Sequence, residues 1–196
     1  MPPVTPWLQG DESMPAFAEP FDFSGCRVCC FTGHRPEGLP QKEADTALLR
    51  LKLIMTVQQA AAAGADVFYA GGARGFDMLA AEAVLFLREQ ERLPLKLKLA
   101  LPSRRQADAW PQDDRRRYYS ILDKADETYY ASDRNDAAAM HTRNRYLVDH
   151  ADCCIAYLRK LSGGTYYTVR YAERRGVPVC NLAEYLPGPK QLSILA

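Results

Sequence analysis

The segment Asp66–Leu87 constrains the fold of this chain more than any other stretch. It joins strand-forming residues at 67–69 to a glycine turn at 71–75 (GGARG), and a run of good helix formers follows at once. Asp77 falls in the first turn of that helix, where the helix dipole favours a carboxylate. A strand, a glycine turn and a helix N-terminus together present free backbone N–H groups to an anion. The segment therefore predicts one half of a nucleotide site.

The glycines of this turn could also serve only a tight change of direction. Arg74, inside the turn, favours an anion site because it adds a cation where the anion would lie. Neither common phosphate-binding motif matches. The dinucleotide fingerprint needs its second glycine elsewhere and an acidic residue about 20 positions later, and the P-loop needs Lys followed by Ser or Thr after the glycines.

Strand and helix patterns alternate along the chain. Strands are expected at 27–32, 67–69, 95–101, 127–131, 151–157 and 179–182, and helices at 43–63, after 75, at 110–124, at 136–150 and from 165 to 175. This alternation predicts an α/β fold of three layers with a mainly parallel sheet. We expect one domain over residues 26–196, preceded by a proline-rich arm at 1–25 that is extended or disordered.

Composition excludes several classes of protein. Charged residues make up 25% of the chain and the formal net charge is +1, which does not favour a general nucleic-acid or membrane surface. Residues 1–26 contain no Lys or Arg and no long apolar run, so a secretory signal is not expected. No apolar stretch approaches the length of a membrane span. We therefore expect a cytoplasmic protein without a membrane partner.

The six cysteines fall in or beside predicted strands. Cys26 and Cys29 have the spacing of metal ligands, but on an extended strand their side chains point to opposite faces. Cysteine is also among the most frequently buried residue types. We therefore expect buried free thiols and no metal site.

Three turns that contain glycine follow the ends of predicted strands. They are Gly33-His34-Arg35, the GGARG turn at 71–75, and Gly163-Gly164-Thr165. In a parallel sheet these strand ends share one edge, where ligands bind at the topological switch point. With Arg35 and Arg74 as cations, the three turns favour phosphate or pyrophosphate over a neutral ligand.

Four motifs together resemble the YpsA-like branch of the SLOG superfamily, which is related to LOG proteins and to DNA-processing protein A. The motifs read CCFTGHRP, AGGARGFDMLAAE, RNRYLVDHAD and SGGTYYTVRYA, and the resemblance covers about residues 26–182. It implies a Rossmann-like fold and a site for a nucleotide-derived ligand. The motif positions of the family fall here on Gly33, His34, Arg35, Gly71, Gly72, Gly75, Asp77, Arg143, Asn144, Gly163, Gly164 and Thr165.

The last turn departs from the LOG phosphoribohydrolases. Those enzymes resemble PGGxGTxxE at this point, with the glutamate acting in catalysis, whereas residues 162–168 read SGGTYYT. The second glycine step and the acid are both missing. The resemblance therefore does not carry the hydrolase reaction over to this chain.

Three functions follow as hypotheses. The first is binding or sensing of a nucleotide or nucleotide-derived ligand without catalysis or cofactor, because no nucleophile–base pair is evident. The second is N-glycosidic hydrolysis of LOG type, with Asp77 or Glu82 as the carboxylate; Asp77 could also serve only the helix dipole, and Glu82 only the structure. The third is binding of single-stranded nucleic acid, which the net charge disfavours and an arginine-rich stretch at 104–117 favours. A homo-oligomer is left open.

Each of the polar site candidates also has a structural alternative. His34 is a ligand contact or a turn residue bonded to local backbone. Arg35 and Arg74 are phosphate contacts or members of surface ion pairs. Arg143 and Asn144 face the ligand or form a hydrogen bond between helices.

Overall fold

The structure is a computed structural model and describes residues 21–185. Its strands are β1 (Val28–Gly33), β2 (Val67–Ala70), β3 (Lys96–Leu101), β4 (Glu127–Tyr130), β5 (Cys153–Tyr157) and β6 (Val179–Asn181). Its α-helices are α1 (Glu43–Ala62), α2 (Phe76–Glu89), α3 (Gln112–Lys124), α4 (Ala137–Asp149) and α5 (Gly163–Arg174). Two short 3-10 helices complete it, η1 (Pro36–Gly38) and η2 (Leu182–Tyr185).

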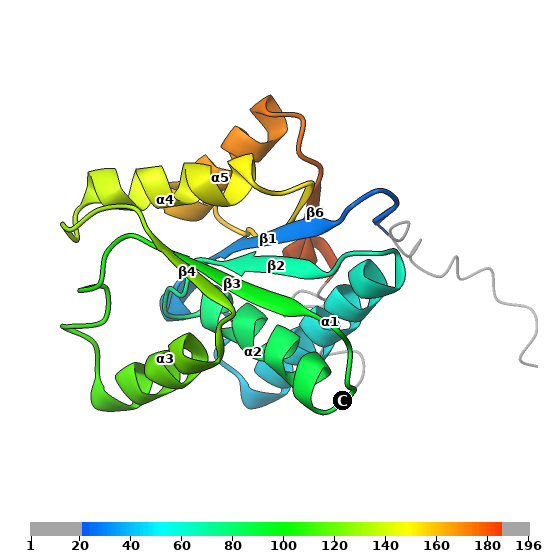
Figure 1. Cartoon of the computed structure of the whole chain (residues 1–196), viewed down its shortest axis with the longest axis horizontal. Coiled ribbons are helices and arrows are strands. Elements are labelled where there is room, and N and C mark those ends of the chain that lie inside the picture. Colours follow the sequence, from blue (N-terminus) through cyan, green and yellow to red (C-terminus); the bar gives the residue numbers. More distant parts are fainter. Residues whose placement is uncertain (1–20, 186–196) are drawn as a thin grey trace, which may run out of the picture.

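The strands form one sheet in the order β4-β3-β2-β1-β5-β6, and every neighbouring pair is parallel. Figure 1 shows α4 and α5 on one face of the sheet and α1, α2 and α3 on the other. The predicted α/β fold of three layers, Rossmann-like with a mainly parallel sheet, is confirmed. The chain builds outward from β1 to β4 and then returns to the other side of β1. The switch point of the sheet therefore lies between β1 and β5.

Helix α2 lies at the centre of its layer, and its sequence explains why. Almost all of its residues are buried, including Phe76, Met78 and Val84, because it contacts both α1 and α3 as well as the sheet. A helix that is apolar nearly all round needs cover on every side. Opposite it, on the other face of the sheet, a smaller core joins Cys30 and Cys154 to Leu147 of α4.

Two residues of the predicted arm pack against the core. Phe23 is 3% exposed and belongs to the main core, and Phe21 packs beside it. Gly25, with φ 81°, turns the chain so that the Cys26 N–H donates to the Phe23 carbonyl at 3.0 Å. The remainder of the predicted arm, residues 1–20, lies outside the described residues.

The cysteines are free and buried, as predicted. The sulfurs of Cys29 and Cys153 lie 3.1 Å apart across the pairing of β1 with β5. Burial raises the pKa of the Cys26 and Cys180 thiols to about 12, so both stay protonated at neutral pH. Within residues 21–185, no helix has the length and apolar character needed to cross a bilayer.

Candidate functional site

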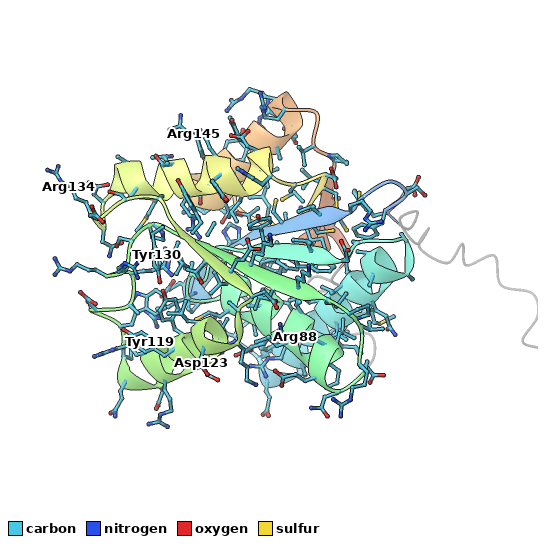
Figure 2. All side chains as sticks on the ribbon, in the orientation of Figure 1. Arg88, Tyr119, Asp123, Tyr130, Arg134 and Arg145 are labelled. Carbon is cyan, nitrogen blue, oxygen red and sulfur yellow. The ribbon has the colours of Figure 1, made fainter. Side chains whose placement is uncertain are left out.

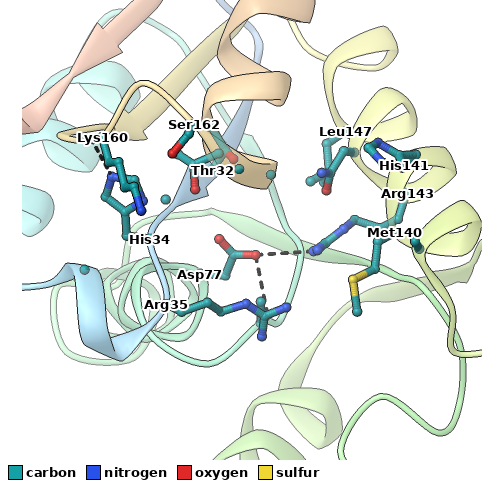
Figure 3. Close-up of a pocket in the computed structure, with 18 of the residues that line it drawn as sticks. Thr32, His34, Arg35, Asp77, Met140, His141, Arg143, Leu147, Lys160 and Ser162 are labelled. Atoms are coloured by element: carbon teal, nitrogen blue, oxygen red, sulfur yellow. Dashed lines mark hydrogen bonds and ion pairs between the residues drawn. The ribbon is translucent and has the colours of Figure 1, made fainter.

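A cavity of about 750 Å³ opens at the switch point, where the loops after β1 and β5 separate. It is large enough for a nucleotide-sized ligand, since such sites are typically about 300–1,000 Å³. The loop after β1, the first turn of α2, one face of α4 and the first turn of α5 form its walls (Figure 3). The predicted ligand residues that line it are Gly33, His34, Arg35, Asp77, Arg143, Asn144, Gly163, Gly164 and Thr165.

A buried ion pair forms one wall of the cavity. Asp77 from α2 and Arg143 from α4 are each 5% exposed, and Oδ2 of Asp77 lies 3.3 Å from Nη1 of Arg143. The same Oδ2 accepts a hydrogen bond from the backbone N–H of Ala73 at 3.4 Å. Figure 3 shows the carboxylate of Asp77 between Arg143 and Arg35. Arg143 therefore forms the bond between helices that one alternative predicted, and it also lines the cavity.

Burial dominates the titration of this pair. Desolvation raises the pKa of Asp77 above its usual range, against the attraction of Arg143 and Arg35. Desolvation likewise lowers the pKa of Arg143, although its guanidinium stays charged because its ordinary pKa is so high. Within the described residues, Nε of Arg143 is buried without a hydrogen-bond partner. The pair is therefore short of acceptor atoms.

The charges that line the cavity sum to an excess of one positive charge. Arg35, Arg143 and Lys160 are cationic, and Glu37 and Asp77 are anionic. An excess charge beside a buried guanidinium is stabilised by an anion. The electrostatics of the cavity therefore favour a negatively charged group.

The N-terminus of α5 adds hydrogen-bond donors to this wall. Its N-cap residue, Ser162, makes no side-chain capping bond. A Cβ placed on Gly163 would meet nothing within 4 Å, and one on Gly164 would meet only Nδ2 of Asn144 at 3.9 Å. The first backbone N–H groups of α5 are therefore reachable from the cavity, with the positive end of the helix dipole behind them.

His34 connects the loop after β1 to the loop after β5 and to the start of α2. Its Nε2 accepts hydrogen bonds from the backbone N–H groups of Arg159 at 2.9 Å and Lys160 at 3.2 Å, in the loop after β5. Its carbonyl accepts from the N–H of Phe76, the first residue of α2, at 3.1 Å. The backbone partners of its ring are 125 and 126 positions away. The alternative expected from the sequence, a hydrogen bond to local backbone, is therefore not what the ring makes.

The ring of His34 is held in its neutral form. Burial, followed by the positive charges of Arg159 and Lys160, lowers its pKa below the usual value of 6.5. Because Nε2 accepts hydrogen bonds, the proton of the neutral ring is on Nδ1. The ring also lines the cavity, so contact with a ligand stays compatible with its place.

The central turn shapes the cavity without lining it, except at Ala73. A Cβ on Gly71 would lie 1.6 Å from Nη1 of Arg143, so glycine is required for the guanidinium to fit. A Cβ on Gly75 would lie 2.6 Å from the carbonyl oxygen of His34. Gly72 faces Leu101, and its carbonyl accepts from Nε2 of Gln106 at 2.9 Å. These three predicted ligand residues thus act through close packing of the turn.

Arg74 and Glu82 lie outside the cavity. Nε of Arg74 is 2.6 Å from Oδ2 of Asp114 in α3, which is the ion pair that the sequence left as its alternative. Glu82 forms an ion pair with Arg117, whose Nη2 donates to Oε2 at 2.6 Å. Of the two carboxylates considered for catalysis, the structure therefore brings only Asp77 to the cavity.

Some lining residues were missed by the sequence argument. Met140 and Leu147 share the face of α4 that carries Arg143, at spacings of three and four residues. That helical spacing, applied outward from Arg143, was a signal that could have found them. Lys160 and Glu37 lie in loops, where no periodic pattern marks them.

Comparisons with known proteins give a consistent result. The model of the YspA SLOG family (YpsA) matches residues 29–176. A UPF0398 protein of Bacillus thuringiensis (strain Al Hakam) is 28% identical over 160 residues, which cover 76% of this chain and 84% of that protein.

Two solved structures are similar in fold. DNA processing protein A from Helicobacter pylori, which binds single-stranded DNA, matches with a TM-score of 0.54 and 20% identity over 78% of this chain and 63% of that one. DNA processing protein A from Streptococcus pneumoniae matches with a TM-score of 0.54 and 16% identity, over 86% and 55% of the two chains. This chain thus spans less than two thirds of either protein. At these identities the likeness shows a shared fold.

Proposed function

Because the chain belongs to the YspA SLOG family, we propose that its switch-point cavity binds or senses a nucleotide or nucleotide-derived ligand through a phosphate group. One observation carries the proposal. The buried guanidinium of Arg143 has an Nε without a partner in residues 21–185 and lines the same cavity as the N-terminus of α5. A charged donor that is buried short of acceptors is costly unless a ligand supplies one.

The arrangement supports a particular orientation of the ligand. The phosphate lies between Arg35, Arg143 and the first turn of α5, because these groups supply the positive charge and the N–H donors. The sugar and base extend along α4, where Met140 and Leu147 offer apolar surface. Asp77 orients the guanidinium of Arg143.

Binding without catalysis is the preferred form of this proposal. Of the two candidate carboxylates, Asp77 and Glu82, Asp77 lies at the cavity. It forms an ion pair with Arg143 and accepts a hydrogen bond from the N–H of Ala73. A nucleophile with an adjacent base is not found among the lining residues. The experiment below therefore also measures hydrolysis of the N-glycosidic bond, as the alternative to binding alone.

Single-stranded nucleic acid is a second candidate ligand, favoured by one contact. The guanidinium of Arg104 lies over the ring of Tyr130, 4.2 Å from its centroid, at the C-terminal end of β4. Such arginine and aromatic surfaces stack on bases. Figure 2 shows Tyr130 and Arg134 on the side of the molecule where the chain passes from β4 into α4. A strand bound there would place one phosphate in the cavity and its neighbours along this edge.

The test compares two arginines against two ligands by calorimetry. Arg35→Ala removes a cation that lines the cavity, whereas Arg74→Ala removes one from a turn outside it. We expect Arg35→Ala to weaken binding of nucleoside monophosphates about 10- to 100-fold, the value of a charge-assisted contact of roughly 1.5–3 kcal/mol, and to leave nucleoside binding unchanged. Arg74→Ala serves as the matched control and leaves both unchanged.

Three results would redirect the proposal. If Arg35→Ala weakens the binding of nucleotide and of nucleoside equally, Arg35 does not contact the phosphate. Release of free base during incubation, followed by chromatography, would establish the hydrolase. Tighter binding of oligonucleotides than of mononucleotides, with a steep dependence on salt, would favour the nucleic-acid ligand.

A further inference from the structure

Helix α1 carries apolar side chains on two opposite faces. The inner face packs into the main core through Leu49, Leu53 and Val57. On the outer face, Leu48, Leu51 and Met55 are 37%, 54% and 51% exposed. A helix at the edge of a domain usually turns a polar face to solvent. Figure 1 shows α1 on the outside of its layer, so this outer face needs a separate explanation.

The outer face follows the spacing of a helix-pairing seam. Its members, all exposed, are Ala44, Leu48, Leu51, Met55, Gln58 and Ala62. They recur at alternating intervals of four and three residues, which keeps them on one stripe that faces a partner helix. Between 44 and 62 the charged residues are Asp45, Arg50 and Lys52, and none of them is a member of the stripe.

The seam is complementary to itself when two copies run antiparallel. A two-fold axis opposite Leu53 places Ala44 against Ala62, Leu48 against Gln58, and Leu51 against Met55 of the other copy. The small residues meet at the two ends and the large ones meet in the middle. Each residue thus finds a partner of suitable size, as a two-fold interface requires.

The helix dipoles favour the antiparallel arrangement, because antiparallel dipoles attract each other. The basic residues do not distinguish the two directions. About the same axis the two Arg50 lie six residues apart, about 9 Å, but the two Lys52 lie only two residues apart, about 3 Å.

From these observations we propose that the outer face of α1 is a homodimer interface, in which α1 of one copy packs antiparallel against α1 of a second copy. The helix has 20 residues. A single helix of this length, about 30 Å long and about 10–12 Å across, offers an interface at or below the lower end of specific interfaces, about 1,200 Å² over the two copies. The dimer is therefore weak, with a dissociation constant in the micromolar range.

The first test is sedimentation of the full chain without ligand over about 1–100 μM, which brackets that affinity. The expected mass rises from 22.0 kDa towards twice that value. Leu51→Glu places a charge in the centre of the seam and is expected to weaken association at least about tenfold. Leu161→Glu is the matched control, because Leu161 is 76% exposed and lies outside α1.

A second test fixes the direction of the helices. Leu51→Cys and Met55→Cys proteins are mixed in a glutathione redox buffer; the native thiols of residues 21–185 are buried and do not compete. The antiparallel seam predicts that the mixed disulfide exceeds either homodimeric one. A chain that stays monomeric over the whole range, a dimer indifferent to Leu51→Glu, or an excess of homodimeric crosslinks would each overturn the proposal. The chain would stay monomeric if other segments of the same chain pack over the outer face of α1.

Discussion

Arg35 and Arg74 occupy similar places in the sequence and different places in the molecule. Each lies in a glycine turn after a buried strand, yet Arg35 lines the cavity and Arg74 pairs with Asp114. The reason is the order of the strands. The turn with Arg35 follows β1, which borders the switch point, whereas the turn with Arg74 follows β2, one strand further from it. A motif predicts a turn that can hold an anion, and the topology decides which turn meets the ligand.

The glycines of the two regions differ in the same way. Gly71, in the central turn, makes room for the guanidinium of Arg143, while a Cβ on Gly164, in the first turn of α5, would meet only Nδ2 of Asn144 at 3.9 Å. The central turn is therefore a support for the site. The turn before α5 is part of its surface.

The largest expected effect comes from substituting Gly71. Gly71→Ala puts a methyl group where Nη1 of Arg143 lies, which separates the Asp77–Arg143 pair. Breaking a buried ion pair typically costs about 3–5 kcal/mol, so the free energy of unfolding in urea should fall by that order. Gly164→Ala is the control and should change it by less than about 1 kcal/mol, since its Cβ is unobstructed and helical alanine is favourable. If the two variants lose equal free energy of unfolding, the central turn does not support the ion pair in the way proposed.

A smaller effect is expected at Arg74. Its pair with Asp114 is about 70% buried on each side and is partly screened by solvent. Arg74→Ala should therefore lower the free energy of unfolding by at most about 1 kcal/mol. Asp114→Ala should do the same, and the double variant should lose little more than either single one, because the two side chains share one interaction. Additive losses would show that Arg74 acts through something other than Asp114.

The smallest effect should appear in the dependence of stability on pH. The pKa of His34 is lower in the folded chain than its usual 6.5. Its contribution to stability is therefore complete above pH 6.5 and is lost as the pH falls through the folded value. His34→Gln keeps an acceptor for the N–H groups of Arg159 and Lys160 but does not titrate. A comparison of thermal midpoints should show a shallower loss on the acid side for this variant. If the thermal midpoints of the two proteins fall equally with pH, protonation of His34 does not break the contacts between the two loops.

The fold was predictable because its signals are local. The helix expected from residue 43 is α1 (Glu43–Ala62). The buried strand β5 lies within the expected 151–157, and β1 runs one residue beyond the expected 27–32. Glycine turns at strand ends also identified part of the cavity wall, at 33–35 and 163–165, since parallel strands end at one edge. By contrast, the separation of Arg35 from Arg74 depends on strand order, which no local pattern specifies. Lys160 lines the cavity from a loop whose backbone N–H groups donate to His34, a contact that no local pattern predicts.

The burial of Phe23 has a similar cause. A stretch before the first strand has no periodicity to mark it, and its place in the core depends on the turn at Gly25. The two-sided character of α1 was visible in the sequence as an apolar helix with few charges. Which of its faces would remain exposed was decided by the packing of the domain.

The position of β1 also fixes the order in which this molecule can be completed during synthesis. Val28 pairs with Val67, which leaves the ribosome soon after it, but Cys29 also pairs with Cys153, 124 positions away. Closing so long a loop is entropically expensive and slow. The half of the sheet from β1 to β4 can therefore assemble while the rest is still being translated. Arg143, Lys160 and the N-terminus of α5 arrive afterwards, so the nascent chain acquires its binding cavity only once α5 has been synthesised.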